Sequence, residues 1–454
     1  MQSSRSGILA ILVGLGIGCA TQGLVAGEAA AGQLYAGWAT VDITPSAPVV
    51  LDGSGYKRVT NEVEDPVTAT VLALETRDGD KVIEQAIMIT FDLVRMTKEV
   101  HEGMQRVAAE RLKDFDSSKL FCGATHTHCG PSISYERTGP GQLYDISQQP
   151  DVMTPQQYIL FLYEKVGAGI VEAWQSRKPA AMSWGLGNAA IGYNRRLSYA
   201  DGSAIMGFDT ARPDFSHVEG SEDHAVEMLF VWDAEQRLTG MLLNIACPSQ
   251  VGRKAISADF WHPIREGIKA KYGANVHVFA QCWAAGDQCP EVIVRSKAEK
   301  LMAERRKITW KQELAKRVIA AVNDVWPYAQ ADIKSRPVFA HRVVKTDIPN
   351  KNSYNEARWM PSTVAVELHV LRLGDIALAT NPFELFLDYG MRLKGRSKAV
   401  LTFVSQLSCD HHGYLPTRRA VAGGDYSAVN HTVGPKGGQV LVEESVKAIN
   451  SLWP

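Results

Sequence analysis

Two histidines lie two residues apart in the segment KLFCGATHTHCGPS (119–132), where a short apolar run ends in a polar loop. The run has the length of a β-strand, and residues at positions i and i+2 near the end of a strand point the same way. His126 and His128 can therefore address one metal ion, or one ion and its substrate. The segment predicts a metal-binding or catalytic site.

Other chemically capable side chains also follow apolar runs of strand length. They are Asp92, Asn194, Arg195, Cys247, Asp287, Cys289, Glu384, His411, His412 and Tyr414. In α/β proteins, the loops beyond the carboxyl ends of the strands converge on ligand sites while the sheet holds them rigid. We therefore expect these loops to form one site.

The composition is that of a globular protein. Of the 454 residues, 45% are hydrophobic and 21% are charged, which excludes a disordered chain. The formal net charge is −1, and no basic cluster or basic-aromatic stripe is present. These features exclude a nucleic-acid partner, and nothing in the sequence indicates a protein partner.

The elements that must position the site alternate along the chain, and they predict a mixed α/β fold with β-sheets flanked by helices. Periodicity predicts hairpins at 67–92, 225–246 and 364–380, with further strands at 119–123, 181–192, 275–281 and 399–405. Helices are predicted at 98–115, 155–176, 260–272, 297–325, 383–394 and 438–451. Segments 130–155 and 345–362 are predicted to be long surface loops, and no internal repeat is visible.

The N-terminus has the pattern of an export signal. Arg5 precedes the apolar segment 8–20, which is too short to span a bilayer, and small residues at 24–32 offer cleavage sites. We expect a signal peptide over 1–30, one domain over 31–454, and a periplasmic or secreted location. An uncleaved anchor is the alternative.

Seven short motifs, in order along the chain, resemble those of neutral ceramidases. They are GWATVDITPS (37–46), ATHTHCGP (124–131), YNRR (193–196), ISADF (256–260), AAGDQCP (284–290), NPFE (381–384) and GYLPT (413–417). Neutral ceramidases are zinc amidases that cleave the N-acyl bond of ceramide. The resemblance implies a neutral-ceramidase-like catalytic domain, here without the C-terminal immunoglobulin-like domain that the family usually carries.

Carried over residue by residue, the resemblance implies a Zn²⁺ ion held by His126, Glu384 and Tyr414. His128 and Arg195 then lie beside the scissile amide, with Tyr414 also counted among the catalytic groups. A zinc ion with nitrogen and oxygen ligands lowers the pKa of bound water to about 7 and polarises an amide carbonyl. The implied activity is hydrolysis of an N-acyl bond of a small-molecule or lipid substrate, with peripheral membrane contact left open.

Two positions depart from the family pattern. The segment that carries the family's second histidine ligand reads ACPSQ (246–250) here, and Cys247 is the expected substitute because zinc accepts thiolates. The alternatives are His262, His411 and His412. Cys289 occupies the place of a family serine at the reacting centre, where a thiol could retain, retune or abolish the serine's role.

The remaining candidates favour structural roles. Asp42 and Asp92 are expected to brace loops. Asp259 and Asp287 are expected to orient the metal ligands without contacting the metal themselves. His101, His277, His341 and His369 fall within helix or strand patterns and are expected to be structural.

Two classes of function follow: an exported zinc hydrolase, or a metal-free binding protein on the same fold. The combination of Glu384, Tyr414, Arg195 and both histidines favours the hydrolase. The substrate is ceramide by resemblance, and another acylated compound or a carbohydrate is the alternative.

Overall fold

The computed structural model describes residues 30–207, 209–351 and 362–454. Except for residue 30, the predicted signal peptide lies outside the described residues, as does most of the predicted loop 345–362. No helix in the described part of the chain is long and apolar enough to cross a membrane.

The first third of the chain forms one compact unit. Its main elements are β1 (Gln33–Asp42), β4 (Thr68–Asp78), β5 (Lys81–Phe91), α1 (Lys98–Arg111), β6 (Leu120–Ala124) and α2 (Pro155–Gln175). Strands β1, β4 and β5 pair antiparallel in that order, and α1 then carries the chain across to β6, which pairs parallel with β5. The unit is a meander that ends in one helical crossover.

The same topology occurs twice more. The second unit contains β7 (Lys178–Asn188), β12 (Ala225–Asp233), β13 (Leu238–Ile245), α3 (Trp261–Tyr272), β14 (His277–Cys282) and α5 (Trp310–Ala331). The third contains β16 (Phe339–Pro349), β17 (Thr363–Leu373), β18 (Ile376–Thr380), α6 (Leu387–Arg396), β20 (Leu401–Ser405) and α9 (Pro435–Asn450). In each unit the last two strands are parallel and the others antiparallel. The chain is thus a threefold structural repeat, although no repeat is visible in its sequence.

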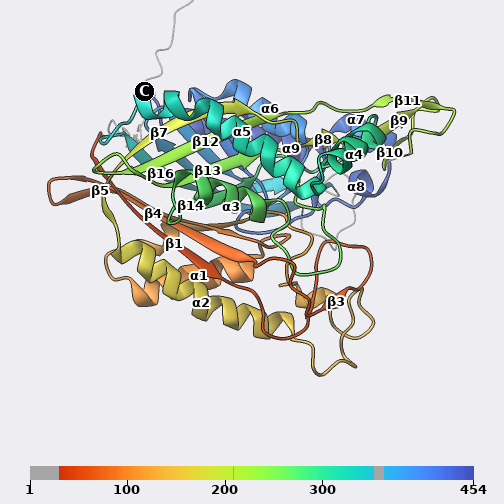
Figure 1. Ribbon diagram of the computed structural model, residues 1–454, viewed down its shortest axis with the longest axis horizontal. Coiled ribbons are helices and arrows are strands. Elements are labelled where there is room, and N and C mark those ends of the chain that lie inside the picture. The colour runs from red at the N-terminus through yellow and green to blue at the C-terminus, as the bar shows by residue number, and fades with distance from the viewer. Residues whose placement is uncertain (1–29, 208, 352–361) are drawn as a thin grey trace, which may run out of the picture.

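The three units share one core. The first two join through β1 and β7 into an eight-stranded sheet of order β14-β13-β12-β7-β1-β4-β5-β6, and the third forms the four-stranded sheet β16-β17-β18-β20. Apolar side chains from all three units, among them Leu72, Phe279 and Phe403, fill the space between the two sheets. The outer faces are covered by α1 and α2, by α3 and α5, and by α6 and α9 (Figure 1).

Burial on both faces explains the sequence of the strands. In β4, Val71 and Ala73 pack toward α1 and α2, whereas Leu72 and Leu74 pack into the central core. A strand that is buried on both faces reads as a continuous apolar run rather than as an alternating one. Each fully buried leucine or valine contributes about 1.5–3 kcal/mol to stability.

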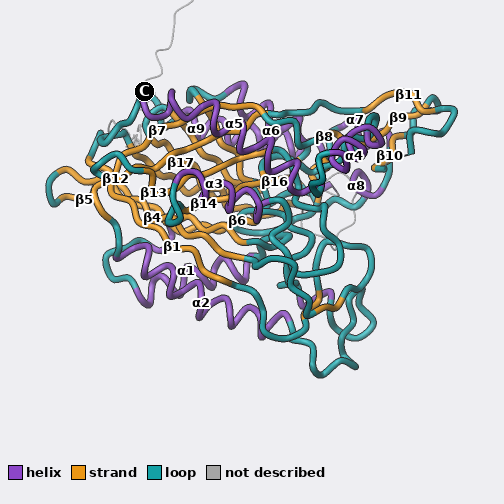
Figure 2. Tube along the Cα trace, in the orientation of Figure 1, coloured by secondary structure: helices purple, strands orange, loops and turns teal. Residues whose placement is uncertain are grey.

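Shorter elements lie between the main ones. They are β2 (Val49–Val50), β3 (Val59–Thr60), η1 (Ser117–Lys119), η2 (Tyr135–Arg137), β8 (Tyr193–Asn194), β9 (Arg196–Tyr199), β10 (Ala204–Met206), β11 (Phe215–Val218), β15 (Gln288–Cys289), α4 (Ser296–Arg305), β19 (Glu384–Leu385), β21 (Tyr414–Leu415), α7 (Arg418–Gly423) and α8 (Tyr426–Val429). Figure 2 shows the long sheet strands on one side of the molecule and most of the loops on the other, with the short strands β9, β10 and β11 among them.

The predicted mixed α/β class and the three hairpins are confirmed, but one predicted helix is wrong. The segment 297–325 is split into α4 and α5, because Lys307 adopts a left-handed backbone (φ 57°) and Thr309 begins a new helix. Thr309 and Gln312 form a reciprocal capping box, which satisfies two otherwise free backbone N–H groups. The predicted loop at 345–362 begins instead as strand, since β16 continues to Pro349.

The carboxyl ends of the three parallel strands meet. The backbone N–H of Cys409, beyond β20, donates to Cys122 O in β6, and the N–H of Gln406 donates to Cys282 O in β14. The loops that leave β6, β14 and β20 therefore start from one place. The sequence predicted a site at these strand ends.

Candidate active site

A cavity of about 730 Å³ opens at this end of the sheets. Its walls contain most of the residues that the sequence singled out. They are His126, His128, Arg195, Cys289, Glu384, His411 and Tyr414, together with Arg58, Arg95, Arg137, Arg253, Glu291 and Tyr426. All three structural units contribute to it.

His126 follows β6 and is buried. Its backbone is left-handed, with φ of 62°, a conformation that costs a non-glycine residue about 1–3 kcal/mol and often occurs at functional sites. Its Nδ1 lies 2.5 Å from Val94 O. Because a carbonyl can only accept, Nδ1 carries the proton, and the lone pair of Nε2 points toward Glu384 Oε2 at 3.6 Å.

Glu384 and Tyr414 lie side by side on a two-stranded parallel ladder. Strand β19 pairs with β21 so that Glu384 is the register partner of Tyr414, and Glu384 N donates to Gly413 O. Burial raises the pKa of Glu384, but its interactions with His126 and His411 outweigh burial and hold that pKa well below its usual value. Burial and the nearby Glu384 charge hold the pKa of the Tyr414 hydroxyl well above its usual value.

His128 lies with its ring edge-on to His126, the centroids 4.8 Å apart. Burial, followed by the neighbouring His126, holds the pKa of His128 well below its usual value, so its imidazole is neutral. Among the described residues, its Nε2 has no hydrogen-bond partner. Gly53 (φ 88°) packs directly against the ring, and a Cβ there would lie 2.7 Å from His128 Nδ1.

Cys289 lies in β15, which pairs with β8, and Arg195 directly follows β8. Arg195 N donates to Asp287 O, and the buried Arg195 Nε has no partner among the described residues. Burial raises the pKa of the Cys289 thiol to about 12, and its Sγ donates to Glu291 O at 3.2 Å. Cys289 is therefore a neutral thiol, which favours a hydrogen-bonding role over a nucleophilic one.

Cys247 is not brought to the cavity wall. Its Sγ donates to Ile191 O at 3.2 Å, and burial holds its pKa well above the usual value. His262 and His412 do not line the cavity either, and His412 pairs with Asp410 at 3.3 Å. His411 does line it, with Nε2 at 3.6 Å from Glu384 Oε1.

The tautomer of His411 limits its role. Arg95 Nη1 lies 3.4 Å from His411 Nδ1, and because the guanidinium can only donate, Nδ1 is the acceptor. The proton of a neutral His411 is therefore on Nε2, facing Glu384. In this arrangement His411 holds the carboxylate, whereas His126 presents a free lone pair.

Aspartates brace the loops around the site, as the sequence predicted for Asp42 and Asp92. Asp92 accepts two hydrogen bonds from Arg265, at 2.6 and 2.9 Å, and another from the Thr125 hydroxyl next to His126. Asp287 accepts from Asn194 Nδ2 and from Leu387 N. Asp259 accepts from Gly252 N, and Asp42 accepts from Thr44 N.

Sequence reasoning missed the arginines that line the cavity and the aspartate that lies behind them. Buried Asp52 lies 3.1 Å from both Arg95 and Arg137, and these charges lower its pKa although burial opposes them. Arg58 donates to the carbonyls of Asp52 and His128. Asp52 and Arg58 lie in the dense polar stretch DGSGYKR (52–58), which is the signal that could have found them, whereas no local pattern marks Arg95 or Arg137.

The donors at the centre of the cavity fit a zinc ion. A zinc-bound histidine typically donates its other ring N–H to a carbonyl or carboxylate, as His126 does to Val94 O. His126, Glu384 and Tyr414 supply one nitrogen and two oxygens. Three protein ligands with an open position are typical of catalytic zinc sites.

Comparison with known proteins finds likeness in structure but not in sequence. No family model matches the chain, and no curated protein matches it. The solved structure of neutral ceramidase from Pseudomonas aeruginosa superposes with a TM-score of 0.69 at 14% identity, covering 93% of this chain and 74% of that chain. The chain has the neutral ceramidase fold.

A second solved structure, described as a ceramidase complexed with C2, gives the same TM-score of 0.69. Its identity to this chain is 13%, and the match covers 93% of this chain and 75% of that chain. The neutral ceramidase fold therefore extends over nearly the whole chain. At these identities the likeness establishes the fold, and the chemistry must be argued from the residues.

Proposed function

We propose that this protein is an exported zinc-dependent hydrolase that cleaves an N-acyl amide bond. The observation that carries the proposal is the arrangement of His126, whose Nδ1 proton is held by Val94 O while its Nε2 faces Glu384. Tyr414, the register partner of Glu384, completes the ligand set. Bound zinc would supply a water molecule of lowered pKa and polarise the amide carbonyl.

The protein's own groups around this centre suit acyl transfer. His128 is neutral and its Nε2 is unpartnered, so it can donate a hydrogen bond to the oxygen that gains charge as the carbonyl carbon becomes tetrahedral. Arg195 brings a permanent positive charge to the same cavity. His126 and His411 keep Glu384 ionised, and Arg95 orients His411 toward it.

Metal analysis and kinetics of matched variants test this proposal. Protein purified without chelator is expected to contain zinc, and His126→Ala and Glu384→Ala to lose most of that zinc and most activity. His128→Ala is expected to keep its zinc and to lose about 10²–10³ in kcat, the usual cost of one transition-state hydrogen bond. A folded, zinc-free wild-type chain that does not bind added zinc would leave the metal-free binding protein as the better reading.

The charge of the cavity favours a second candidate for the substrate. Five arginines line it (Arg58, Arg95, Arg137, Arg195 and Arg253) against two glutamates. Asp52 behind the wall neutralises part of this charge, and a zinc ion would add to it. Such a surface favours an acylated substrate that carries a phosphate, sulfate or carboxylate group over neutral ceramide.

A matched pair of substrates separates these candidates. A short-chain ceramide and its 1-phosphate contain the same amide bond and differ only in one anionic group. If the arginines select for charge, kcat/KM is higher for the phosphate, and Arg253→Gln, which removes an exposed wall charge, reduces that preference. Faster cleavage of neutral ceramide by the wild-type enzyme would support the neutral lipid as substrate.

Export is proposed from residues 1–30 of the sequence. Expression of the full chain should yield a mature protein that begins within or just after the small-residue stretch 24–32. N-terminal sequencing of the protein from the periplasmic and medium fractions tests this proposal. An intact N-terminus in the membrane fraction would support the uncleaved anchor instead.

A further inference from the structure

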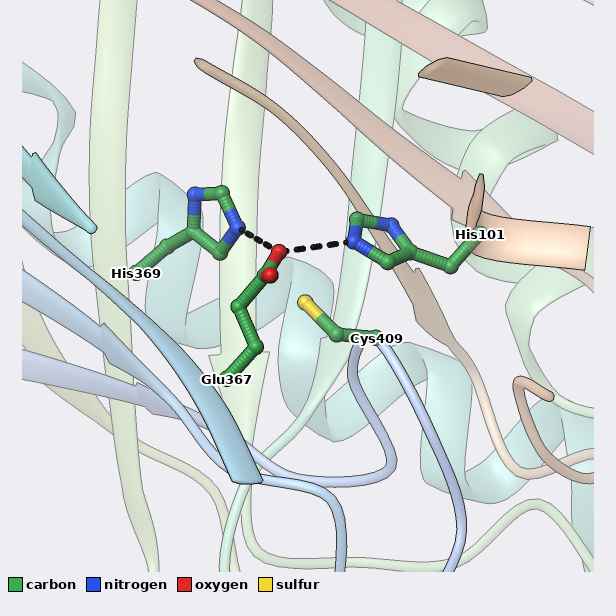
Figure 3. Close-up of side chains that lie close together, drawn as sticks. All are labelled: His101, Glu367, His369 and Cys409. Carbon is green, nitrogen blue, oxygen red and sulfur yellow. Dashed lines mark hydrogen bonds and ion pairs between the residues drawn. The ribbon is translucent and has the colours of Figure 1, made fainter. Parts of the chain in front are cut away.

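Four side chains with metal-binding atoms meet in the protein interior, away from the cavity wall. They are His101 of α1, Glu367 and His369 of β17, and Cys409 of the loop after β20, and one donor atom from each lies within 4.8 Å of the other three. His101, His369 and Cys409 are buried, with exposed fractions of 3%, 0% and 2%. Figure 3 shows both imidazoles pointing at the carboxylate, with the sulfur beside it.

The hydrogen bonds around His369 orient it as a metal ligand. His341 Nδ1 lies 3.3 Å from Gln85 O, which can only accept, so Nδ1 carries the proton. A neutral His341 then accepts at Nε2 from His369 Nδ1, 2.9 Å away. The lone pair of His369 Nε2 is left facing Glu367 Oε1 at 3.1 Å.

This relay leaves two acceptor atoms facing each other. A lone pair 3.1 Å from a carboxylate oxygen is repulsive unless a proton or a cation lies close to both. His101 Nε2 reaches the same oxygen, at 3.0 Å. Two imidazole nitrogens, one carboxylate oxygen and one thiol thus surround a common point.

A divalent cation accounts for the charge of the cluster. Two neutral imidazoles, one carboxylate and one thiolate carry a total charge of −2, which a divalent ion cancels in the protein interior. Lys345 contacts the outer carboxylate oxygen, Glu367 Oε2, at 3.2 Å and leaves Oε1 for the cluster. Zinc is the ion that best suits such mixed nitrogen, sulfur and oxygen donors in a four-coordinate site.

The distances between the four ligand atoms need only a small adjustment to fit a tetrahedral zinc ion. Zinc bonds of about 2.0–2.3 Å in a tetrahedron place neighbouring ligand atoms about 3.3–3.6 Å apart. The two closest contacts in the cluster, 3.0 and 3.1 Å, lie just below that range, and the remaining separations reach at most 4.8 Å. Side-chain rotations are enough to reach the required geometry.

We propose that His101, Glu367, His369 and Cys409 form a structural zinc site, separate from the centre at His126 and Glu384. Four protein ligands leave no open position, which is typical of structural sites. The ion would join helix α1 of the first unit to strand β17 and the 406–412 loop of the third. It would thereby fix the loop that carries His411 into the cavity.

Cobalt substitution of the wild-type chain tests the site without any variant. Co²⁺ bound to a thiolate gives a near-ultraviolet sulfur-to-metal charge-transfer band, whereas Co²⁺ bound to His126, Glu384 and Tyr414 has no sulfur ligand. We expect the cobalt-loaded protein to show this band, and His126→Ala to keep it. A folded, cobalt-loaded chain without the band would overturn the proposal.

Matched thiol variants then locate the ligand. Cys409→Ser should abolish the band and reduce the zinc content by one ion per chain, whereas Cys247→Ser, which changes another buried thiol, should leave both unchanged. A band lost in Cys247→Ser and retained in Cys409→Ser would refute the site. His126→Ala, which removes only the cavity metal, separates failure of this site from failure of the proposed catalytic site. If this site fails, wild type holds one zinc per chain and the variant holds none. If the catalytic site fails, wild type and variant both hold one zinc per chain.

Discussion

Replacing Asp92 by asparagine removes the negative half of a buried ion pair behind the active-site loop. Asp92 is 0% exposed and the Arg265 side chain is 7% exposed, and two hydrogen bonds of 2.6 and 2.9 Å join them. Breaking a buried pair from one side leaves an uncompensated charge and costs about 3–5 kcal/mol. We expect the free energy of unfolding to fall by about that amount.

Urea unfolding followed by tryptophan fluorescence measures this loss. With an m value of about 3 kcal/mol/M for a chain of this size, the midpoint should fall by about 1–1.7 M. Asp42→Asn is the control, because exposed Asp42 caps only Thr44 N, and it should shift the midpoint by less than about 0.3 M.

The double variant separates charge from packing. Asp92→Asn combined with Arg265→Gln removes the unpaired charge as well, so it should recover part of the stability lost in Asp92→Asn alone. Additive losses in the two single variants, or a midpoint shift for Asp92→Asn no larger than that of the control, would refute the reasoning. Zinc content should fall with Asp92→Asn, because Asp92 also holds Thr125 next to His126.

Three further predictions concern the surroundings of the site. Burial raises the pKa of Asp287 from 3.8 to about 6, so the folded state holds its proton more tightly and about 3 kcal/mol of stability is lost as the pH rises from 4 through 6. Asp287→Asn should remove that slope in urea midpoints measured from pH 4 to 7.5, and an unchanged slope would contradict the assignment. Gly53→Ala should lower kcat but keep zinc, because its Cβ would strike the His128 ring, whereas Gly55→Ala, with nothing within 4 Å, should leave kcat unchanged. Alkylation with peptide mapping should label Cys247 equally with and without zinc, since its thiol faces Ile191 O, and zinc-dependent protection would make it a ligand after all.

The sequence predicted helices and strands well where their buried residues follow a regular period or form an unbroken apolar run. The hairpin at 67–92 became β4 and β5 because their apolar residues form long uninterrupted runs. The helix at 297–325 failed because the break at Lys307 depends on a left-handed backbone, which composition does not reveal. Strand β16 was missed because its exposed half is polar enough to resemble a loop.

The sequence predicted the site residues that directly follow a strand. It did not predict side-chain directions that depend on tertiary packing. His126, His128, Glu384 and Tyr414 reach one cavity, as their positions after apolar runs suggested. Cys247 also ends a strand, yet its side chain turns toward Ile191, and no local pattern encodes that choice.

The same limit applies to the interior histidines. His101 and His369 were expected to be structural, and their helix and strand positions agree with that expectation. Their meeting with Cys409 depends on the packing of the first unit against the third, which no periodicity in the sequence reveals.

The threefold repetition of the fold bears on which side chains the site can hold. Three units of one topology place three corresponding loops, those after β6, β14 and β20, next to one another. In an assembly of three identical chains, every residue of such a loop would be present three times. A single continuous chain is free of that restriction, so the loop after β6 carries two histidines while the loops after β14 and β20 carry Cys289 and His411. A repeated framework can therefore hold a set of side chains that does not repeat.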